Sequence, residues 1–416
     1  MNSIENLRFK IVSGLYVRQV IILLIGLFLP IGSGFTLITG INLSKYVSIL
    51  VLILGLYTVF FFKINKRYFP IPFLLLTFYM IFHVIIIYGV LKIESVFKIQ
   101  NDEYILTALF RFFIYIVFSY VLAIHINSLK TLRLFVFFFS IGYIITLIVG
   151  FIAPKDILDQ GRIAGGFENP NSFAATSLSV LFLNFLLFVF FIKQKQIKLI
   201  YLIFFLVSLS GIIFSQSRAV LFGLFMGSLF IFFSNKGLNA KLKALLSISI
   251  LILIMAIIIP KDIVHDFKKR ASMSRRIESK RESRIIIWQS YLNELPKHVL
   301  FGKGREQTTS IVAKYNLPPK WQAPHNRYLY IICEFGFLAL LFFIYFLYIV
   351  YQRIKNSETE HVFLKRVLLA YFICWITMIF FGDYKNSRDY WLFIALMISF
   401  GNNFTILSLN KVKEYK

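Results

Sequence analysis

About twelve stretches of mostly apolar residues, each near the length of a membrane-spanning helix, follow one another along the chain. A helix needs about 20 such residues to cross the hydrocarbon core of a bilayer. The stretches are 19–39, 46–62, 71–91, 104–126, 134–152, 173–192, 199–215, 219–233, 244–259, 327–350, 367–382 and 389–408. The sequence therefore predicts an all-α polytopic membrane protein.

The composition excludes the main soluble classes. Of the 416 residues, 58% are apolar and only 15% are charged, whereas a soluble domain has about 45–50% and about 25%. So few charges cannot cover a water-facing surface, which excludes a soluble enzyme, a disordered chain and a secreted disulfide scaffold. Cys333 and Cys374 lie in apolar stretches, and we expect them to be small core residues without a disulfide.

The distribution of charge predicts the orientation. The net charge of +26 would favour nucleic-acid binding on a soluble protein, but Lys and Arg of membrane proteins collect in cytoplasmic loops and at anionic lipid. No nucleic-acid partner is therefore expected. The segments on the side of the N-terminus carry more Lys and Arg than the short loops opposite, so both termini are predicted to be cytoplasmic. Stretch 19–39 exceeds the apolar core of a signal peptide, about 7–15 residues, and is expected to remain as a span.

One long polar segment divides the chain into three parts. Residues 1–259 hold the first nine predicted spans, residues 260–326 form a large loop on the outer side, and residues 327–416 hold the last three spans and a cytoplasmic C-terminus. Segment 260–283 is strongly basic. Outer segments of about 60 residues or more largely escape the charge rule, so the predicted orientation stands.

The second half of the large loop is predicted to contain an amphipathic helix over 284–295. The apolar side chains at helical spacing are Ile285, Trp288, Leu292 and Leu295. Pro296 is expected to end this helix. Arg284 lies one turn before Trp288, so a cation and a flat ring share one face, as at a sugar-binding surface or a lipid interface. An interfacial helix with an incidental Arg explains the pattern equally well.

The loop 153–173 is the first of two polar places between predicted spans. It contains Arg162, a turn at Asn169–Pro170, and Asn171 as a candidate cap for the next span. An ordinary hairpin, with Arg162 paired to Glu168, is the alternative interpretation.

The second polar place is Ser215–Arg218, which joins two apolar stretches with almost no loop. Arg218 must therefore lie at or just under the outer interface. There it either extends to lipid headgroups or, beside a cavity, binds phosphate through its fork of donors.

His325 and Asn326 directly precede the span at 327–350. An imidazole at the mouth of a helix can take a proton from a hydroxyl, and Asn326 is placed to orient it. Glu334 lies two turns deeper in the same span, where ionisable residues are costly and suggest a function. The alternatives are a structural histidine and a Glu334 that pairs with Arg111.

Several signatures of other enzymes are absent from the sequence, among them an acidic DxD-like pair, HExxH, Cys/His metal spacing, a Walker loop and GxSxG. A Mg²⁺ or Mn²⁺ site built of carboxylates is not expected, because acidic residues are few on the predicted outer side. The spans hold few charges beyond Arg111 and Glu334, so an ion-coupled transporter has few groups to use.

Four motifs, in this order, resemble the O-antigen ligase and polymerase superfamily. They are the glycine-rich loop from Arg162 to Asn171, the SxSR turn at Ser215–Arg218, the Arg284-x-x-x-Trp288 helix in a large outer loop, and His325–Asn326 followed by nine residues and Gly336. Each motif is weak by itself. Their order along about twelve spans is the signal, and the likeness extends over about 150–400.

The resemblance implies a GT-C-like fold and a metal-independent, inverting glycosyl transfer, without a cofactor, at the periplasmic face of the bacterial inner membrane. It implies a glycan on undecaprenyl pyrophosphate as donor. His325 takes the place of the general base, Arg218 and Arg284 take the places of pyrophosphate-binding residues, and Arg162 is a weaker third. The supporting residues are Asn326, Trp288 and Glu334.

Three functions remain open at this point. A ligase that transfers O-antigen to lipid A-core is favoured, because the basic outer segment suits an anionic acceptor. An O-antigen polymerase, which elongates lipid-linked repeat units, uses the same donor chemistry. A flippase or other transporter of lipid-linked oligosaccharide would need polar groups along a path through the spans, and the sequence has few.

Overall fold

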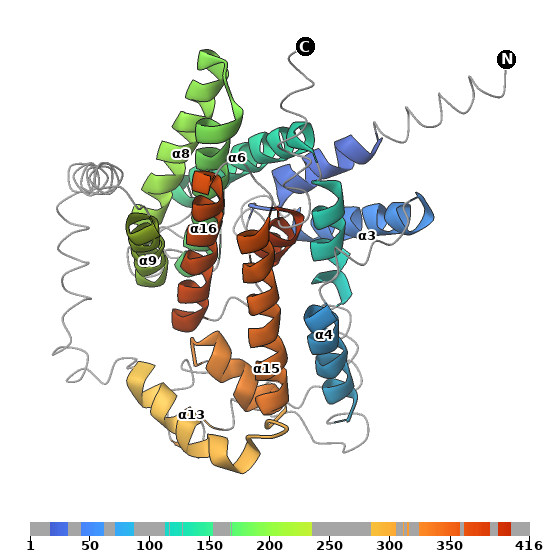
Figure 1. The fold of residues 1–416 in the computed structure, drawn as a ribbon, viewed down its shortest axis with the longest axis vertical. Helices are drawn as coiled ribbons and strands as arrows, with labels where there is room; N and C mark the ends of the chain where they lie inside the picture. Colours follow the sequence, from blue (N-terminus) through green and yellow to red (C-terminus); the bar gives the residue numbers. More distant parts are fainter. Residues whose placement is uncertain are drawn as a thin grey trace.

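The computed structural model describes the chain in separate ranges, and every regular element within them is helical (Figure 1). The described residues are 17–31, 43–61, 71–86, 113–115, 117–126, 128–152, 167, 169–234, 284–304, 311, 314–315, 324–357, 362–382 and 390–400. Figure 1 shows α4, α8, α15 and α16 running roughly along one direction, with α3 and α6 crossing it.

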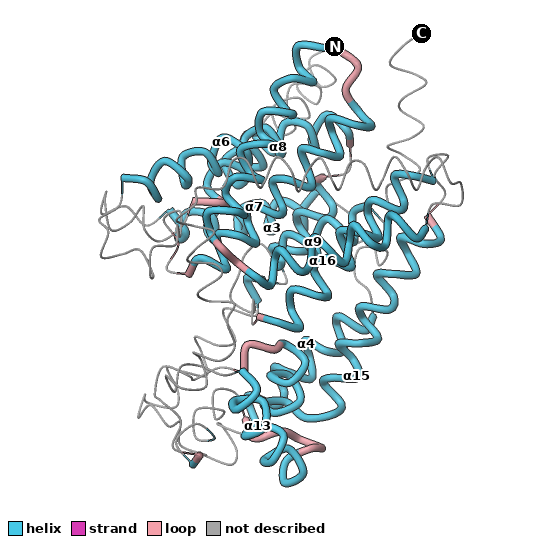
Figure 2. The backbone as a smooth tube through the Cα atoms, turned by 90° about the vertical axis from the view of Figure 1, so that its left-hand side faces the viewer, coloured by secondary structure: helices cyan, strands magenta, loops and turns pink. Residues whose placement is uncertain are grey.

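Each predicted span that the structure describes overlaps an apolar helix over part or all of its length, and 244–259 lies outside the described residues. The helices long and apolar enough to cross a membrane are α6 (Leu129–Ile152), α7 (Pro170–Leu186) with the π-helical turn Leu187–Phe191, α8 (Lys195–Ser215), α15 (Arg327–Asn356) and α16 (Val362–Phe381). Shorter apolar helices are Val17–Phe28, Phe113–His125, Tyr390–Phe400 and those within α3 (Leu43–Phe61), α4 (Ile71–Val84) and α9 (Arg218–Ser234). This pattern fits the predicted polytopic membrane protein. A more polar helix, α13 (Arg284–His298), lies with the start of α15 at one end of the molecule (Figure 2).

Helices α9 and α16 pack closely through small residues. A methyl group added at Gly223 would lie 2.8 Å from the carbonyl oxygen of Cys374, and one at Gly227 would lie 2.9 Å from that of Ala370. Small residues four positions apart let helix backbones approach closely in a membrane. Because the later glycine faces the earlier residue of α16, the two helices are antiparallel, and α9 begins beside the end of α16.

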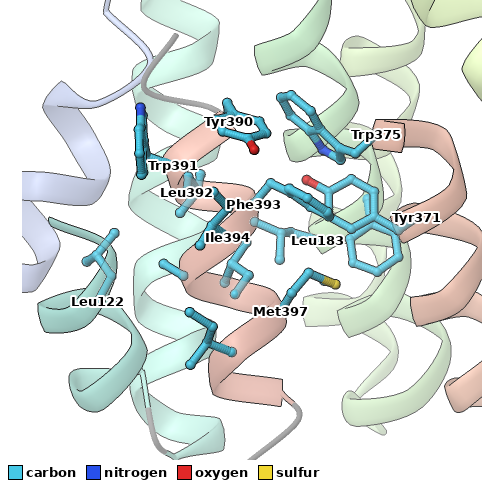
Figure 3. Packing of buried hydrophobic residues seen from close by; sticks show 14 of the residues in the cluster. Leu122, Leu183, Tyr371, Trp375, Tyr390, Trp391, Leu392, Phe393, Ile394 and Met397 are labelled. Atoms are coloured by element: carbon cyan, nitrogen blue, oxygen red, sulfur yellow. The ribbon is translucent and has the colours of Figure 1, made fainter. Parts of the chain in front are cut away.

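The helix Tyr390–Phe400 lies inside the bundle (Figure 3), and all of its side chains are buried. Phe393 stacks on Trp375 of α16, with the ring centroids 5.1 Å apart. Tyr371 of α16 in turn stacks on Phe182 of α7 at 3.8 Å. A helix that is apolar on every side is buried on every side, so this last helix forms part of the core.

Buried hydroxyl groups connect the long helices. Tyr143 of α6 and Ser177 of α7 share a hydrogen bond of 2.8 Å, and Tyr371 of α16 donates to Ser179 of α7 at 3.0 Å. A polar group buried without a partner is costly, so these pairs favour one rotational setting of each helix.

Helix α15 is broken at Gly336, which has φ 86° and ψ −180°, a conformation open essentially only to glycine. In a straight helix, Tyr328 and Phe343 would be about 22 Å apart along the axis. Their ring centroids lie 5.8 Å apart, so the part before Gly336 folds back along the part after it. The predicted span over 327–350 thus lies within α15, as expected, but its axis changes direction at Gly336.

The loop that follows α13 fills this break. The amides of Lys303 and Gly304 donate to the two carbonyl groups three and two residues before Gly336, at 2.7 and 3.0 Å, and the amide of Phe337 donates to the carbonyl of Val299 at 2.7 Å. A break leaves backbone groups without their partners in the helix. The loop supplies new partners and thereby fixes the angle between the two parts of α15.

Candidate functional site

The end of α16 brings together the three helices that carry the predicted site residues. Phe381 contacts Phe222 of α9 with ring centroids 5.3 Å apart. Phe380 contacts Trp288 of α13 at 5.6 Å and Tyr328 of α15 at 6.2 Å. Each of these three rings lies within about one helical turn of a predicted residue, and these residues are Arg218, Arg284 and His325. The end of α16 therefore lies beside the helix segments that carry the predicted residues.

Arg218 is the first residue of α9, and its side chain is exposed. The turn before it is tight, because Gln216 has a left-handed backbone with φ 51° and ψ 32° and its amide donates to the carbonyl of Ile213 at 3.0 Å. The amide of Ser217 donates to the hydroxyl of Ser215 at 3.2 Å. These bonds fix the residue at which α9 begins, and with it the position of Arg218.

The start of α7 lies against the same turn. Asn169, and not Asn171 as predicted, caps α7: its side-chain oxygen accepts a hydrogen bond from the amide of Asn171 at 2.8 Å. The side chain of Asn171 instead accepts a hydrogen bond of 2.9 Å from Ser217. This bond connects the end of the polar loop 153–173 to the turn Ser215–Arg218, which is far from it in the sequence. Arg162 lies outside the described residues.

His325 is half-buried and has a left-handed backbone with φ 49°. The next residue, Asn326, caps α15, because its side-chain oxygen accepts a hydrogen bond from the amide of Leu329 at 2.9 Å. A cap of this kind fixes the residue at which a helix begins. Asn326 therefore holds the backbone next to His325.

Trp288 of α13 holds the chain on the other side of His325. Its indole Nε1 donates to the carbonyl oxygen of Pro324 at 2.6 Å, while its ring contacts Phe380 edge-on. The sequence suggested a sugar-binding or interfacial ring. The structure shows that this half-buried ring also connects α13 to the residue before His325.

Glu334 is fully buried, in the last turn before the break at Gly336. Helix α4 supports this turn, because the hydroxyl of Tyr79 donates to the carbonyl of Phe335 at 2.8 Å. Arg111, the partner considered for Glu334, lies outside the described residues. Glu334 thus lies where α4, α15 and the loop after α13 meet.

The predicted amphipathic helix is present and begins at Arg284, which is half-buried. Its buried face differs from the prediction: Ile287 and Tyr291 are fully buried and pack with Leu329 of α15, whereas Leu292 is 52% exposed. Spacing alone did not show which face α15 would cover. The prediction is therefore wrong at Leu292.

Pro296 lies inside α13, which continues to His298, so the prediction that Pro296 ends the helix is also wrong. Proline lacks the amide that would bond the carbonyl of Leu292, four residues earlier. In the last turn this removes few further bonds, and the amide of Gly302 still donates to the carbonyl of His298 at 2.7 Å.

Glu294 is the centre of a charged cluster on α13. It is 3% exposed and accepts hydrogen bonds from Lys314, from Tyr315 at 3.2 Å and from Lys297 at 3.4 Å. The bond from Lys314 lowers the pKa of Glu294 to about 2, against the opposing effect of burial. Two lysines around one carboxylate leave the cluster with a net positive charge.

Two further basic groups border this cluster. Burial, reinforced by the nearby Lys303, lowers the pKa of His298. Burial also lowers the pKa of Lys303, while Glu294 acts in the opposite direction. A half-buried ammonium group next to the break in α15 is suited to an anionic ligand that replaces the lost hydration.

Arg327 is a buried charge that the sequence reasoning left without a role. It is 7% exposed, lies over the ring of Tyr330 at 5.6 Å, and lines a cavity of 20 Å³ between α4, α15 and the helix Tyr390–Phe400. A cavity of this size holds about one water molecule. In the sequence, Arg327 stands out as a charged residue at the first position of the apolar stretch 327–350.

Cys333 and Cys374 are free and buried, as predicted. Within the described ranges, no three His, Cys, Asp or Glu side chains gather as the ligands of a metal ion do. The helix segments that meet at the end of α16 carry the guanidinium groups of Arg218 and Arg284 and the imidazole of His325.

The comparison with known families identifies the central part of the chain. Residues 202–344 match the family described as O-Antigen ligase. The match covers about a third of the chain and includes Arg218, Arg284 and His325, whereas Arg162 lies before it. No curated protein matches the chain. Residues 202–344 are therefore similar to the O-antigen ligase family, which supports over that range the resemblance inferred from the motifs.

Proposed function

We propose that the protein is an O-antigen ligase that transfers a glycan from undecaprenyl pyrophosphate to lipid A-core in lipopolysaccharide biosynthesis. The family match supports glycosyl transfer. The observation that carries the proposal is the meeting of α9, α13 and α15 around Phe380 and Phe381. This arrangement brings the helix segments that carry Arg218, Arg284 and His325 to one end of a bundle of apolar helices.

The proposed reaction needs one base and a site for a leaving anion. His325 takes the proton of an acceptor hydroxyl as its oxygen forms a bond to the anomeric carbon, and the bond from that carbon to the pyrophosphate breaks with inversion. The electron pair of that bond leaves with the pyrophosphate, which Arg218 and Arg284 stabilise. Because a glycosyl pyrophosphate already has a good leaving group, this electrostatic assistance suffices without a metal ion or cofactor.

The positions of the helix ends support a site on one side of a membrane. Four helix ends that are predicted to be on the outer side lie near the end of α16. They are the starts of α7, α9 and α15 and the end of α8. We assign this side to the periplasm, with the protein in the inner membrane, both termini in the cytoplasm and residues 260–326 as a periplasmic segment. Residues 1–259 and 327–416 then form the membrane parts of a GT-C-like enzyme.

The charge next to α13 favours an anionic acceptor. Lys297, Lys303 and Lys314 surround the single carboxylate of Glu294. Such a surface attracts the phosphorylated lipid A-core, as a ligase requires, more than an uncharged growing glycan. A polymerase, whose acceptor is a second lipid-linked glycan, is the alternative within the same chemistry.

Purified full-length protein with a lipid-pyrophosphate glycan and lipid A-core tests the reaction directly. We expect product with EDTA present and with no ion gradient, which contradicts a flippase or other transporter. His325→Ala is expected to abolish transfer while donor binding is retained. Turnover of His325→Ala at the wild-type rate would remove His325 from the role of base.

The arginines are tested by donor kinetics. Arg218→Ala and Arg284→Ala are each expected to lower kcat/KM for the donor by about 10- to 100-fold, the usual effect of removing hydrogen bonds to a charged group. The matched control is Arg366→Ala, because Arg366 lies about 21 Å before Phe380 along α16. Unchanged donor kinetics for either site variant would contradict its assignment.

The acceptor is tested in cells by the banding pattern of lipopolysaccharide. Loss of a ligase removes all O-units from lipid A-core, and this is the expected result of deleting the gene. Loss of a polymerase instead leaves a core with a single O-unit, and that pattern would replace the ligase by the polymerase.

A further inference from the structure

Gln216 combines two unfavourable features in the turn that precedes Arg218. Its backbone is left-handed, with φ 51°, and within the described part of the chain only one other non-glycine residue, His325, has a positive φ. Its side chain is also 6% exposed. Residues held in sparsely populated backbone conformations cluster at functional sites: Gln216 lies two residues before the proposed Arg218, and His325 is itself a proposed site residue.

The carboxamide oxygen of Gln216 is buried and accepts no hydrogen bond within the described part of the chain. The two neighbouring serines use their hydroxyls locally: Ser215 donates to the carbonyl of Ile212 at 2.6 Å, and Ser217 donates to Asn171 at 2.9 Å. A buried acceptor without a donor is unfavourable, and such groups are few in native structures. The turn therefore holds one unused acceptor beside Arg218.

The turn itself does not require glutamine. Its backbone amide caps α8, and glycine would adopt the left-handed conformation at this position without the steric cost of a side chain. The contacts within the protein therefore explain neither the choice of residue nor the burial of its carboxamide.

We propose that the carboxamide oxygen of Gln216 accepts a hydrogen bond from a hydroxyl or amide N–H on the sugar joined to the pyrophosphate of the donor. This inference rests on the proposed function, in which Arg218 binds the pyrophosphate. Ionised phosphate oxygens only accept hydrogen bonds, so they cannot satisfy a carboxamide oxygen. The nearest donors on such a ligand belong to the first sugar. Gln216 thus makes the site specific for that sugar.

The first test compares three substitutions at Gln216 in the full-length protein, with transfer and thermal unfolding measured in detergent. Gln216→Leu removes the acceptor, and Gln216→Gly removes it while relieving the backbone. Both variants are expected to lose about 10- to 100-fold in kcat/KM, although Gln216→Gly unfolds at the same temperature as wild type or higher. Wild-type activity of Gln216→Gly would show that the residue serves only the turn and would overturn the proposal.

Gln216→Glu keeps an acceptor of the same shape and is expected to retain more activity than Gln216→Leu. Less activity than Gln216→Leu would mean that the buried end of the side chain donates to phosphate, which overturns the sugar assignment. Gln194→Leu is the matched control, because Gln194 is exposed at the opposite end of α8. This control is expected to have wild-type kinetics.

The second test uses donors whose first sugar lacks one hydroxyl or acetamido group at a time. Wild type is expected to lose about 10- to 100-fold on one of these donors, and Gln216→Leu is expected to use that donor and the parent equally. Discrimination that persists in Gln216→Leu would overturn the proposal. A different result would contradict the proposed function itself, namely that wild type transfers no glycan from the parent donor.

Discussion

The helical bundle and the region around α13 are held together in different ways. In the bundle, glycines of α9 lie against the backbone of α16, and rings such as Phe393 and Trp375 stack in the core. Around α13, backbone hydrogen bonds fill the break in α15, and charged groups surround Glu294. The bundle therefore depends on volume and shape, whereas the α13 region depends on individual polar bonds.

The proposed site lies on the border between these regions. Arg218 belongs to a helix that the bundle fixes through α16, while His325 lies between bonds made by α13 and by the cap of α15. A change in either region can reach the site, but by a different route. Substitutions of matched type in the two regions separate these routes.

Gly336→Ala is expected to have the largest effect. Its added methyl group would lie 2.1 Å from the carbonyl oxygen of Leu300, at a φ of 86°. We expect a loss of about 3 kcal/mol or more in the free energy of unfolding, together with loss of amide protection over 299–304 by hydrogen exchange. In the bundle, Gly223→Ala meets the carbonyl of Cys374 at 2.8 Å and is expected to leave 299–304 protected. Equal deprotection by both variants would contradict the comparison.

Trp288→Phe keeps a ring against Phe380 but removes the hydrogen bond to the carbonyl of Pro324. Because this bond lies next to His325, we expect kcat to fall by about 10-fold, the value of one hydrogen bond of about 1.4 kcal/mol, with the KM for donor unchanged. The readout is the kinetics of transfer by the purified protein. The control in the bundle is Trp375→Phe, which is expected to lower the unfolding temperature while kcat is retained. If Trp375→Phe lost as much kcat as Trp288→Phe, Trp288 would act only through the stability of the protein.

Tyr143→Phe removes a buried hydrogen bond to Ser177 in the bundle. The expected loss is about 1 kcal/mol in the free energy of unfolding, measured by denaturation in detergent. Transfer at a temperature well below unfolding should be unchanged. Reduced kcat in this variant would mean that polar bonds in the bundle affect the site as those near α13 do.

The smallest expected effect is a local response to acid around α13. The pKa of Glu294 is lowered from 4.5 to about 2 by the bond from Lys314, so its charged form stabilises the folded cluster above pH 4.5. This contribution is lost progressively as the pH falls from 4.5 to 2. Hydrogen exchange should show loss of protection in 284–304 over that range, with α9 and α16 unaffected. Glu294→Gln should remove the pH dependence, and its persistence in that variant would assign the effect to another group.

The sequence predicted the positions of the apolar helices well, because hydrophobic length is a local property that each stretch carries by itself. It also identified Arg218, Arg284 and His325 as unusual, because polar residues are conspicuous at the ends of apolar stretches. Their roles in chemistry stay predictions. The structure adds that one end of α16 touches a neighbour of each.

The wrong predictions share a cause. The buried face of α13 depends on where α15 lies. Asn171 does not cap α7, since its side-chain oxygen accepts a hydrogen bond from Ser217 in another turn. Spacing along one segment contains no information about such partners. Gly336 was noted as part of a motif, but only the contact between Tyr328 and Phe343 shows that the helix folds back there.

The sequence by itself therefore determined a polytopic helical membrane protein with one long basic segment between its apolar stretches, because composition and hydrophobic length decide whether a segment is stable in lipid. Only the tertiary structure decided that α9, α13 and the broken α15 meet at the end of α16, and that Trp288 and Asn326 hold the two sides of His325. Those contacts join residues far apart in the chain, so they depend on the packing of the whole molecule and on a backbone angle that only glycine adopts readily.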